Sequence, residues 1–243
     1  MPGSILRLHG AWDTEAGRAW CMALPETLAK AAESAVVYRA RNVLTRLDGP
    51  TGPVVVKAFG RGKWWKPSRG LGKAGASYDN GVRCLRLGIG TPEPRAAVLA
   101  PGTGGFYVCD WSGGCRSVWD LHDGALPAEH LAPLAEFVAH MHQAGVHHQD
   151  LTPGNVLLRP AGAGFEHLLI DLNRMRFASV TLRAGLAALA KLECHGRLLE
   201  PYARARAADV ARAQRIFDRL TLIERTSRRL KNATRPWRRK VGL

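Results

Sequence analysis

The sequence predicts an α+β fold of two lobes, a small β-rich lobe followed by a mainly helical one. Short apolar and β-branched runs separated by turn signals fill the first half of the chain. Apolar residues at helical spacing dominate the second half. A lysine within a strand of the first half and a dense polar loop in the second half favour a cleft between the lobes.

The composition is that of a folded protein with an unusual charge. Of the 243 residues, 46% are hydrophobic and 23% are charged, which excludes a largely disordered chain. The 35 basic residues outnumber the 20 acidic ones, and the net charge of +15 favours an anionic membrane surface, nucleic acid or phosphorylated substrate as partner. The sequence contains no recognisable signal peptide, membrane-spanning run or disulfide framework, so a cytoplasmic location is expected.

The first half contains five expected strands and one expected helix. The strands are expected at residues 35–38, 42–47, 54–59, 96–100 and 105–111. The helix is expected at 77–87, because Ser77 is a suitable N-cap, apolar residues share one face and Gly88 follows the end.

The second half contains a short hairpin between expected helices. One helix begins near Pro133, because proline is favoured in the first turn. Residues 156–158 and 168–170 are expected strands, and the chain is helical from Thr181 onward. The expected organisation is an N-terminal extension without an assigned role, an N-lobe, a C-lobe and a basic tail, at residues 1–33, 34–110, 115–224 and 225–243.

The strongest chemical signal is the loop HQDLTPGN at residues 148–155, followed by Asp171 at the end of an apolar strand. Phosphoryl transfer needs a carboxylate facing the acceptor hydroxyl, and Asp150 is the candidate for this catalytic base. Mg²⁺ needs oxygen ligands, which Asn155 and Asp171 offer. Each residue alone could simply cap a turn, but their order beside apolar strands favours a catalytic site.

Lys57 and three further residues are candidates for binding the nucleotide. Lys57 could reach the phosphates of ATP, and the three valines before it favour a half-buried strand over a solvated lysine. Asp79, in the next expected helix, could be the acidic partner of Lys57, although the helix dipole also favours an acid near a helix start. Asp110 and Ser112 lie at the connector between the lobes, where backbone groups could receive the adenine edge.

Several of these segments resemble known kinases. The loop 148–155 resembles the catalytic loop of protein-kinase-like enzymes, and Ile170-Asp171-Leu172-Asn173 stands where those enzymes carry their metal-binding Asp-Phe-Gly. Residues 171–177, DLNRMRF, together with TPGN at 152–155, resemble the lipopolysaccharide kinase family, the InaA/WaaP and Kdo-kinase group. The segments KAF at 57–59 and LGIGTPEP at 87–94 resemble the N-lobe of that family.

The resemblance implies a protein-kinase-like fold, ATP and Mg²⁺ as cofactors, and a sugar hydroxyl of the lipopolysaccharide inner core, on Kdo or heptose, as acceptor. It also implies work at the inner face of the inner membrane. By position, Asp150 would be the base, Asn155 and Asp171 the Mg²⁺ ligands, and Lys57 the phosphate anchor. Gln149 stands where protein kinases carry arginine, which argues against a regulated kinase of proteins.

Two alternatives stay open beside a glycolipid or sugar kinase. One is a kinase of soluble small molecules, of the aminoglycoside or choline type, whose cationic substrates suit a basic chain poorly. The other is a catalytically silent adaptor or nucleic-acid-associated module, against which the complete set of site residues argues. We therefore expect no nucleic acid as partner. The basic tail, with eight basic residues and no acidic one, and the Trp64-Trp65 loop are candidates for contact with an anionic membrane.

Overall fold

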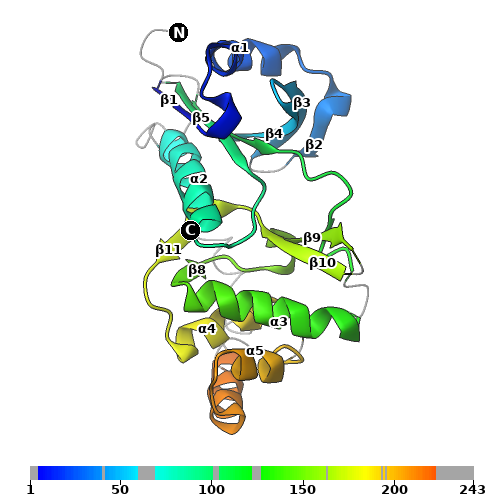
Figure 1. Cartoon of the computed structure of the whole chain (residues 1–243), viewed down its shortest axis with the longest axis vertical. Coiled ribbons are helices and arrows are strands. Elements are labelled where there is room, and N and C mark those ends of the chain that lie inside the picture. The colour runs from blue at the N-terminus through cyan, green and yellow to red at the C-terminus, as the bar shows by residue number, and fades with distance from the viewer. Residues whose placement is uncertain are drawn as a thin grey trace, which may run out of the picture. The chain divides into compact units, whose positions relative to one another are not determined.

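The computed structural model describes residues 5–39, 42–59, 69–100, 104–121, 127–162, 164–192, 194 and 196–222. The Trp64-Trp65 loop and the basic tail lie outside these residues. The chain forms two compact units (Figure 1). The sheet unit consists of Met1–Ser117 and Asn155–Met175, and the helical unit consists of Val118–Gly154 and Arg176–Leu243.

A six-stranded antiparallel sheet forms the centre of the sheet unit, in the order β1-β5-β6-β4-β3-β2. Its strands are β1 (Ile5–Leu8), β2 (Val36–Arg39), β3 (Val43–Gly49), β4 (Gly52–Phe59), β5 (Pro94–Ala100) and β6 (Gly104–Asp110). Five of the six lie within two residues of the strands expected from the sequence. The sixth, β1, adds to the edge of the sheet by pairing with β5.

Each face of the sheet packs against one helix. On one face, alternate residues of β4, β5 and β6 form a core with Cys21 and Leu24 of α1 (Glu15–Lys30). On the other face, Ala74 and Tyr78 of α2 (Arg69–Arg86) pack with residues of the opposite parity, including Tyr107. Since successive side chains of a strand point to opposite faces, strands β4, β5 and β6 are covered by α1 on one face and by α2 on the other.

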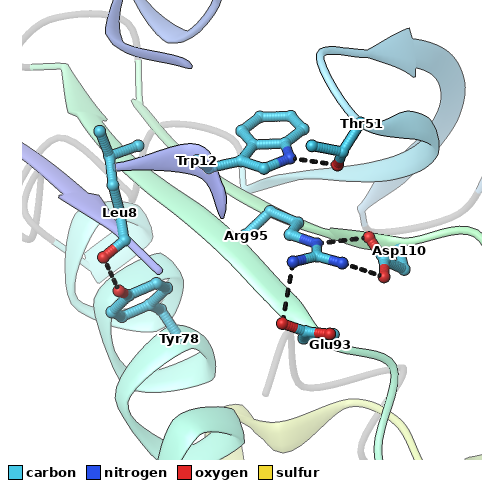
Figure 2. A network of polar contacts seen from close by, with 7 residues as sticks. All are labelled: Leu8, Trp12, Thr51, Tyr78, Glu93, Arg95 and Asp110. Carbon is cyan, nitrogen blue, oxygen red and sulfur yellow. Dashed lines mark hydrogen bonds and ion pairs between the residues drawn. The ribbon is translucent and has the colours of Figure 1, made fainter. Parts of the chain in front are cut away.

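The N-terminal segment is part of this core rather than an appendage. Trp12 is fully buried, and its Nε1 donates to Oγ1 of Thr51 at 2.8 Å (Figure 2). The Trp20 ring packs edge-on against the Trp12 ring, with 5.0 Å between the ring centroids. A Cβ at Gly49 would lie only 2.6 Å from the Trp12 ring, so the glycine lets the indole fit. The expected extension at residues 1–33 therefore supplies one strand, one helix and a core tryptophan to the sheet unit.

The helix α2 begins eight residues earlier than expected. Ser77 is therefore not an N-cap; it lies inside the helix, where its hydroxyl donates to the carbonyl of Lys73 at 2.8 Å. The glycines at 70, 72 and 75 lower helix propensity, so the sequence pattern did not predict that the helix begins at Arg69. Packing of Ala74 against the sheet stabilises the helix there despite its glycines.

A small three-stranded sheet completes the sheet unit, in the order β10-β9-β7. Its strands are β7 (Arg116–Ser117), β9 (Val156–Ala161) and β10 (Gly164–Leu169). The amide of Leu169 donates to the carbonyl of Gly90 at 2.9 Å, and the buried hydroxyl of Thr91 donates to the carbonyl of Leu169 at 2.8 Å. These bonds explain why residues 155–175, expected in the C-lobe, form part of the sheet unit.

The helical unit is built around α3 (Ala128–Gln143), which packs against α5 (Leu199–Ala205). Its other elements are α4 (Leu182–Leu189), the helical residues 210–222 and a two-stranded sheet of β8 (Val146–His148) and β11 (Met175–Phe177). Pro133, expected at the first turn, lies five residues inside α3.

Short 3₁₀ helices in the described residues are η1 (Gly10–Trp12), η2 (Glu33–Ala35), η3 (Pro153–Asn155), η4 (Leu172–Arg174) and η5 (Ala190–Leu192). Within the described residues, no helix has both the length and the apolar character needed to cross a membrane.

Candidate functional site

Lys57 and Asp171 meet in the sheet unit although 114 residues separate them in the sequence. Lys57 pairs with Tyr107 in the β4–β6 ladder, so its side chain lies on the face covered by α2. Its Nζ donates to Oδ1 of Asp171 at 2.7 Å, and the two side chains are 14% and 33% exposed. The Lys57 Nζ also lies 5.3 Å from the centre of the Phe59 ring. The pair is therefore partly shielded from water but open enough for a ligand to reach the carboxylate.

The backbone of Asp171 adopts the left-handed conformation, with φ 58° and ψ 49°. Few residues other than glycine adopt it, and aspartate is among the better tolerated. The side-chain amide of Asn173 donates to the same Oδ1 that receives Lys57. Among the described residues, no hydrogen bond reaches Oδ2. The carboxylate thus has one oxygen held by two donors and one oxygen turned away from them.

The segment around Asp171 is tied to its surroundings by backbone contacts. The amide of Ile170 donates to the carbonyl of Asn155 at 3.0 Å, so Asn155 adjoins the residue before Asp171. On the other side, the side-chain amide of Asn80 in α2 donates to the carbonyl of Leu172 at 2.7 Å. The Leu172 side chain is 2% exposed and anchors the turn in the core.

Asp79 occupies a different position from the one expected for the partner of Lys57. Its carboxylate pairs with Arg7 of β1, and both side chains are substantially exposed. Because α2 begins at Arg69, Asp79 lies in the middle of the helix, and the interpretation as an acid at a helix start is wrong. The carboxylate that pairs with Lys57 belongs to Asp171.

Asp110, at the end of β6, is engaged through its side chain and its backbone (Figure 2). Arg95 donates to both carboxylate oxygens, at 2.6 and 2.7 Å, and also to Glu93 at 2.8 Å. The hydrogen bonds that Arg95 donates to the Asp110 carboxylate raise the pKa of Arg95. The amide of Asp110 donates to the carbonyl of Glu93, and that of Trp111 to the carbonyl of Pro53, both at 3.0 Å.

Two backbone donors of the connector are therefore already used within the sheet unit. Asp110 also has the parity of Val108, whose side chain lies on the α1 face, opposite to Lys57. The carbonyl of Ser112 accepts from the amide of Cys115 at 3.3 Å. An adenine edge bound at this connector would have to use backbone groups other than the Asp110 and Trp111 amides.

Asp150 lies in the helical unit, on a loop whose backbone is fixed at several points. Its amide donates to Nδ1 of the fully buried His148 at 3.2 Å, and its carbonyl accepts from the amide of Thr152 at 2.9 Å. The Nζ of Lys191 donates to the carbonyl of Gln149 at 2.6 Å. The Leu151 side chain is fully buried, so the residue after Asp150 anchors the loop in the core.

Comparisons with known proteins show which family and which solved structures this chain resembles. A sequence model described as "Lipopolysaccharide kinase (Kdo/WaaP) family" matches residues 114–213. The solved structure of WaaP in complex with acyl carrier protein superposes with a TM-score of 0.60 at 22% identity, covering 93% of this chain and 99% of that one. The family resemblance is confirmed.

A second solved structure extends the comparison of the fold. The complex of the Rio2 kinase from Chaetomium thermophilum with ADP/Mg²⁺ and phosphoaspartate superposes with a TM-score of 0.52 at 14% identity. The superposition covers 87% of this chain and 77% of that one. A comparison with curated protein sequences finds no match. The predicted α+β, protein-kinase-like fold and the predicted enzyme class, a phosphotransferase with an alcohol group as acceptor, are confirmed.

The structure distributes the predicted site residues of this kinase over both units. The six that lie in the sheet unit are Lys57, Asp79, Asp110, Ser112, Asn155 and Asp171, whereas Asp150 lies in the helical unit. Lys57 and Asp171 are in direct contact, and Asn155 adjoins the segment of Asp171. Two residues in this arrangement were not candidates: Asn80 and Asn173. Only the position of Asn173 in the DLN motif could have pointed to it.

Proposed function

We propose that this kinase transfers the γ-phosphate of ATP to a sugar hydroxyl of the lipopolysaccharide inner core, on Kdo or heptose. The family match over residues 114–213 supports the lipopolysaccharide substrate. The observation that carries the proposal is the contact between Lys57 and Asp171, which joins the two residues that sequence reasoning assigned to phosphate and metal. The Rio2 kinase structure is a complex with ADP and Mg²⁺, and we propose ATP and Mg²⁺ as the cofactors of this chain.

The donor set fits Mg²⁺. Asn155 offers an amide oxygen and Asp171 a carboxylate, and Mg²⁺ prefers such hard oxygen ligands. Oδ2 of Asp171 receives no hydrogen bond from the described residues, and the backbone of Asn155 adjoins the same segment. When bound, Mg²⁺ supplies neutralisation of the charge that develops on the β- and γ-phosphates. Lys57 would bind phosphate oxygens on the same side and hold the nucleotide in place.

Asp150 would accept the proton of the acceptor. As the sugar oxygen bonds to the γ-phosphorus, the bond from that phosphorus to ADP breaks and the hydroxyl proton passes to the Asp150 carboxylate. The hydrogen bonds at His148 and Thr152 hold the backbone of Asp150, so the carboxylate needs little reorganisation to act. Backbone groups near Ser112 are proposed for the adenine edge.

Turnover of ATP with and without purified lipopolysaccharide core tests the proposal. We expect Mg²⁺-dependent turnover that requires the acceptor and is lost in Asp150→Asn, which keeps the size of the side chain but removes the base. The matched control is Asp218→Asn, an exposed aspartate of the helical residues 210–222. Phosphate found on Kdo or on heptose by mass spectrometry decides between the two sugars.

Other outcomes identify the alternatives. Turnover with an aminoglycoside or choline but not with core sugar would assign the chain to the soluble small-molecule kinases. ATP binding without turnover on any acceptor would indicate a silent adaptor. Binding to RNA or DNA that weakens steeply with salt would indicate a nucleic-acid-associated module.

Attachment to the membrane is proposed from the sequence of the basic tail. Its eight basic residues would each contribute about 1 kcal/mol near an anionic surface. We expect the chain to cosediment with vesicles that contain anionic lipid and to remain in solution with neutral vesicles. Loss of vesicle binding on removal of residues 225–243 would assign the binding to the tail. Absence of vesicle binding at moderate salt would refute the proposed membrane attachment.

A further inference from the structure

The conformation of Asp171 depends on side chains other than Lys57. A lysine ammonium is a point charge on a flexible stem, so by itself it defines the orientation of a carboxylate poorly. A left-handed backbone at a residue other than glycine persists only where the surroundings over-determine it. The described contacts that do so here come from two asparagines, Asn80 and Asn173.

Asn173 fixes the side chain of Asp171. Its amide nitrogen donates to Oδ1, the oxygen that also receives Lys57. A hydrogen bond between side chains two residues apart closes a small local ring, which leaves the carboxylate little rotational freedom. With Oδ1 held by two donors, Oδ2 is the oxygen left to bind a cation.

Asn80 fixes the backbone beside Asp171. Its amide donates at 2.7 Å to the carbonyl of Leu172, the residue that follows Asp171. At the neighbouring Gly81, a Cβ would lie 2.5 Å from Cγ of Pro94 in β5 and 3.3 Å from both the Leu172 side chain and the Tyr107 hydroxyl. Such distances are tighter than ordinary packing, so glycine lets α2 lie close to both β5 and the turn at Leu172.

We propose that Asn80 and Asn173 are positioning residues that hold Asp171 with Oδ2 directed at the metal ion. The coupling of α2 to the site then runs through the main chain at Leu172 rather than through an acidic residue paired with Lys57. The inference rests on the proposed role of Asp171 as a Mg²⁺ ligand. In place of the expected ion pair between Asp79 and Lys57, it assigns a main-chain contact to the neighbouring Asn80.

The test is the affinity for ATP measured by calorimetry with Mg²⁺ and with EDTA. The ratio of the two dissociation constants reports the metal site without any need for turnover. We expect Asn173→Ala and Asn80→Ala each to lower this ratio by about tenfold, the size of one lost charge-assisted or buried hydrogen bond. The metal-free affinity is expected to stay within about twofold of wild type, because the Lys57 ammonium is retained.

Further variants separate positioning from folding. Asn173→Ser keeps a hydrogen-bond donor and should restore most of the ratio, whereas Asn173→Asp places a like charge beside Asp171 and should restore none. The matched control is Gln143→Ala, which also removes a side-chain amide bonded to a main-chain carbonyl, that of Ala205 in the helical unit. Urea unfolding checks that each variant is folded. If Asn80→Ala does not fold, the Asn173 variants alone test the positioning role.

The outcomes keep this inference distinct from the proposed function. A wild-type ratio that both alanine variants retain overturns the positioning role, whatever the acceptor. A wild-type protein that binds ATP equally with Mg²⁺ and EDTA overturns it together with the metal role of Asp171. Metal-enhanced ATP binding that the variants lose, in a protein that phosphorylates no core sugar, supports the positioning role and refutes the substrate.

Discussion

The guanidinium of Arg95 holds both carboxylate oxygens of Asp110, with Nε 2.6 Å from Oδ1 and Nη2 2.7 Å from Oδ2. The Arg95 side chain is only 13% exposed, and its third nitrogen binds Glu93. Arginine alone offers this planar pair of donors, so the end of β6 is fixed in orientation as well as in distance.

We expect Arg95→Lys to lower the free energy of unfolding by about 1–2 kcal/mol, because lysine cannot bond both oxygens at once. Urea denaturation measures the loss. Arg159→Lys is the control, because Arg159 pairs with Glu166 in an exposed position where the expected loss is at most about 1 kcal/mol. Equal losses in the two variants would show that the Arg95 contact has no special strength.

Lys57→Met should abolish most of the activity while leaving the fold intact. It removes the positive charge from the site, and loss of one preorganised electrostatic contact typically lowers kcat by about 10²–10³-fold. Acceptor-dependent ATP turnover provides the rate, and circular dichroism provides the check on folding. Lys30→Met, at the exposed end of α1, is the control.

Asp79→Asn should leave ATP binding within about twofold of wild type. The carboxylate pairs with Arg7 at the surface, and exposed ion pairs contribute at most about 1 kcal/mol to stability. Calorimetry of ATP binding measures the affinity. A loss of ATP affinity as large as that of Lys57→Met in the same calorimetric assay would indicate that Asp79 is a functional partner of Lys57.

The core of the helical unit should make the protein sensitive to acid. Burial lowers the pKa of His142 from 6.5 to about 3, with smaller contributions from His147 and Arg206. Nδ1 of His142 contacts the hydroxyl of Tyr202 at 2.8 Å. Because the unfolded chain binds the proton near pH 6.5 and the folded chain does not, this stability is complete above pH 6.5 and is lost as the pH falls towards 3.

The expected slope is up to about 1.4 kcal/mol per pH unit from His142 within that window. Urea denaturation between pH 7 and pH 4 measures it. His142→Gln removes the titrating group and should flatten the curve, and His140→Gln, on the exposed face of the same helix, is the control. Curves of identical slope in wild type and His142→Gln would contradict the prediction.

Trp12→Ala should destabilise the sheet unit strongly. It empties the space of a fully buried indole and leaves Thr51 without its partner, which typically costs about 3–5 kcal/mol. Trp119→Ala, at a 60% exposed site, should change stability by no more than about 0.5 kcal/mol. Thermal and urea unfolding compare the two variants directly.

The parts of the fold that the sequence predicted are those with a strong local pattern. The valines before Lys57 and the turn at 47–53 define two strands without help from the rest of the chain. By contrast, β1 is a strand because it pairs with β5, and α1 contains Gly17 and Pro25, which obscure its helical pattern. Those elements depend on tertiary contacts, which local propensity does not encode.

The candidate site shows the same division. The order of Asp150, Asn155 and Asp171 beside apolar strands made them recognisable. Asn80 was not recognisable, because its contact is with a main-chain carbonyl 92 residues away, which no residue type at that position reveals. The charge of Asp79 made it a candidate partner of Lys57. Its actual pairing with Arg7 depends on β1, which the sequence pattern had not predicted.

The sheet unit is interrupted in the chain by residues 118–154, yet its two pieces end close together. Ser117 of β7 pairs with Leu157 of β9 in antiparallel register. A hairpin linker of a few residues could therefore join Ser117 directly to Asn155. Such a shortened gene, ending at Met175, would encode Lys57, Asn155 and Asp171 on one continuous polypeptide while omitting Asp150. The residues proposed to bind the nucleotide and its metal would then be encoded separately from Asp150, the proposed base.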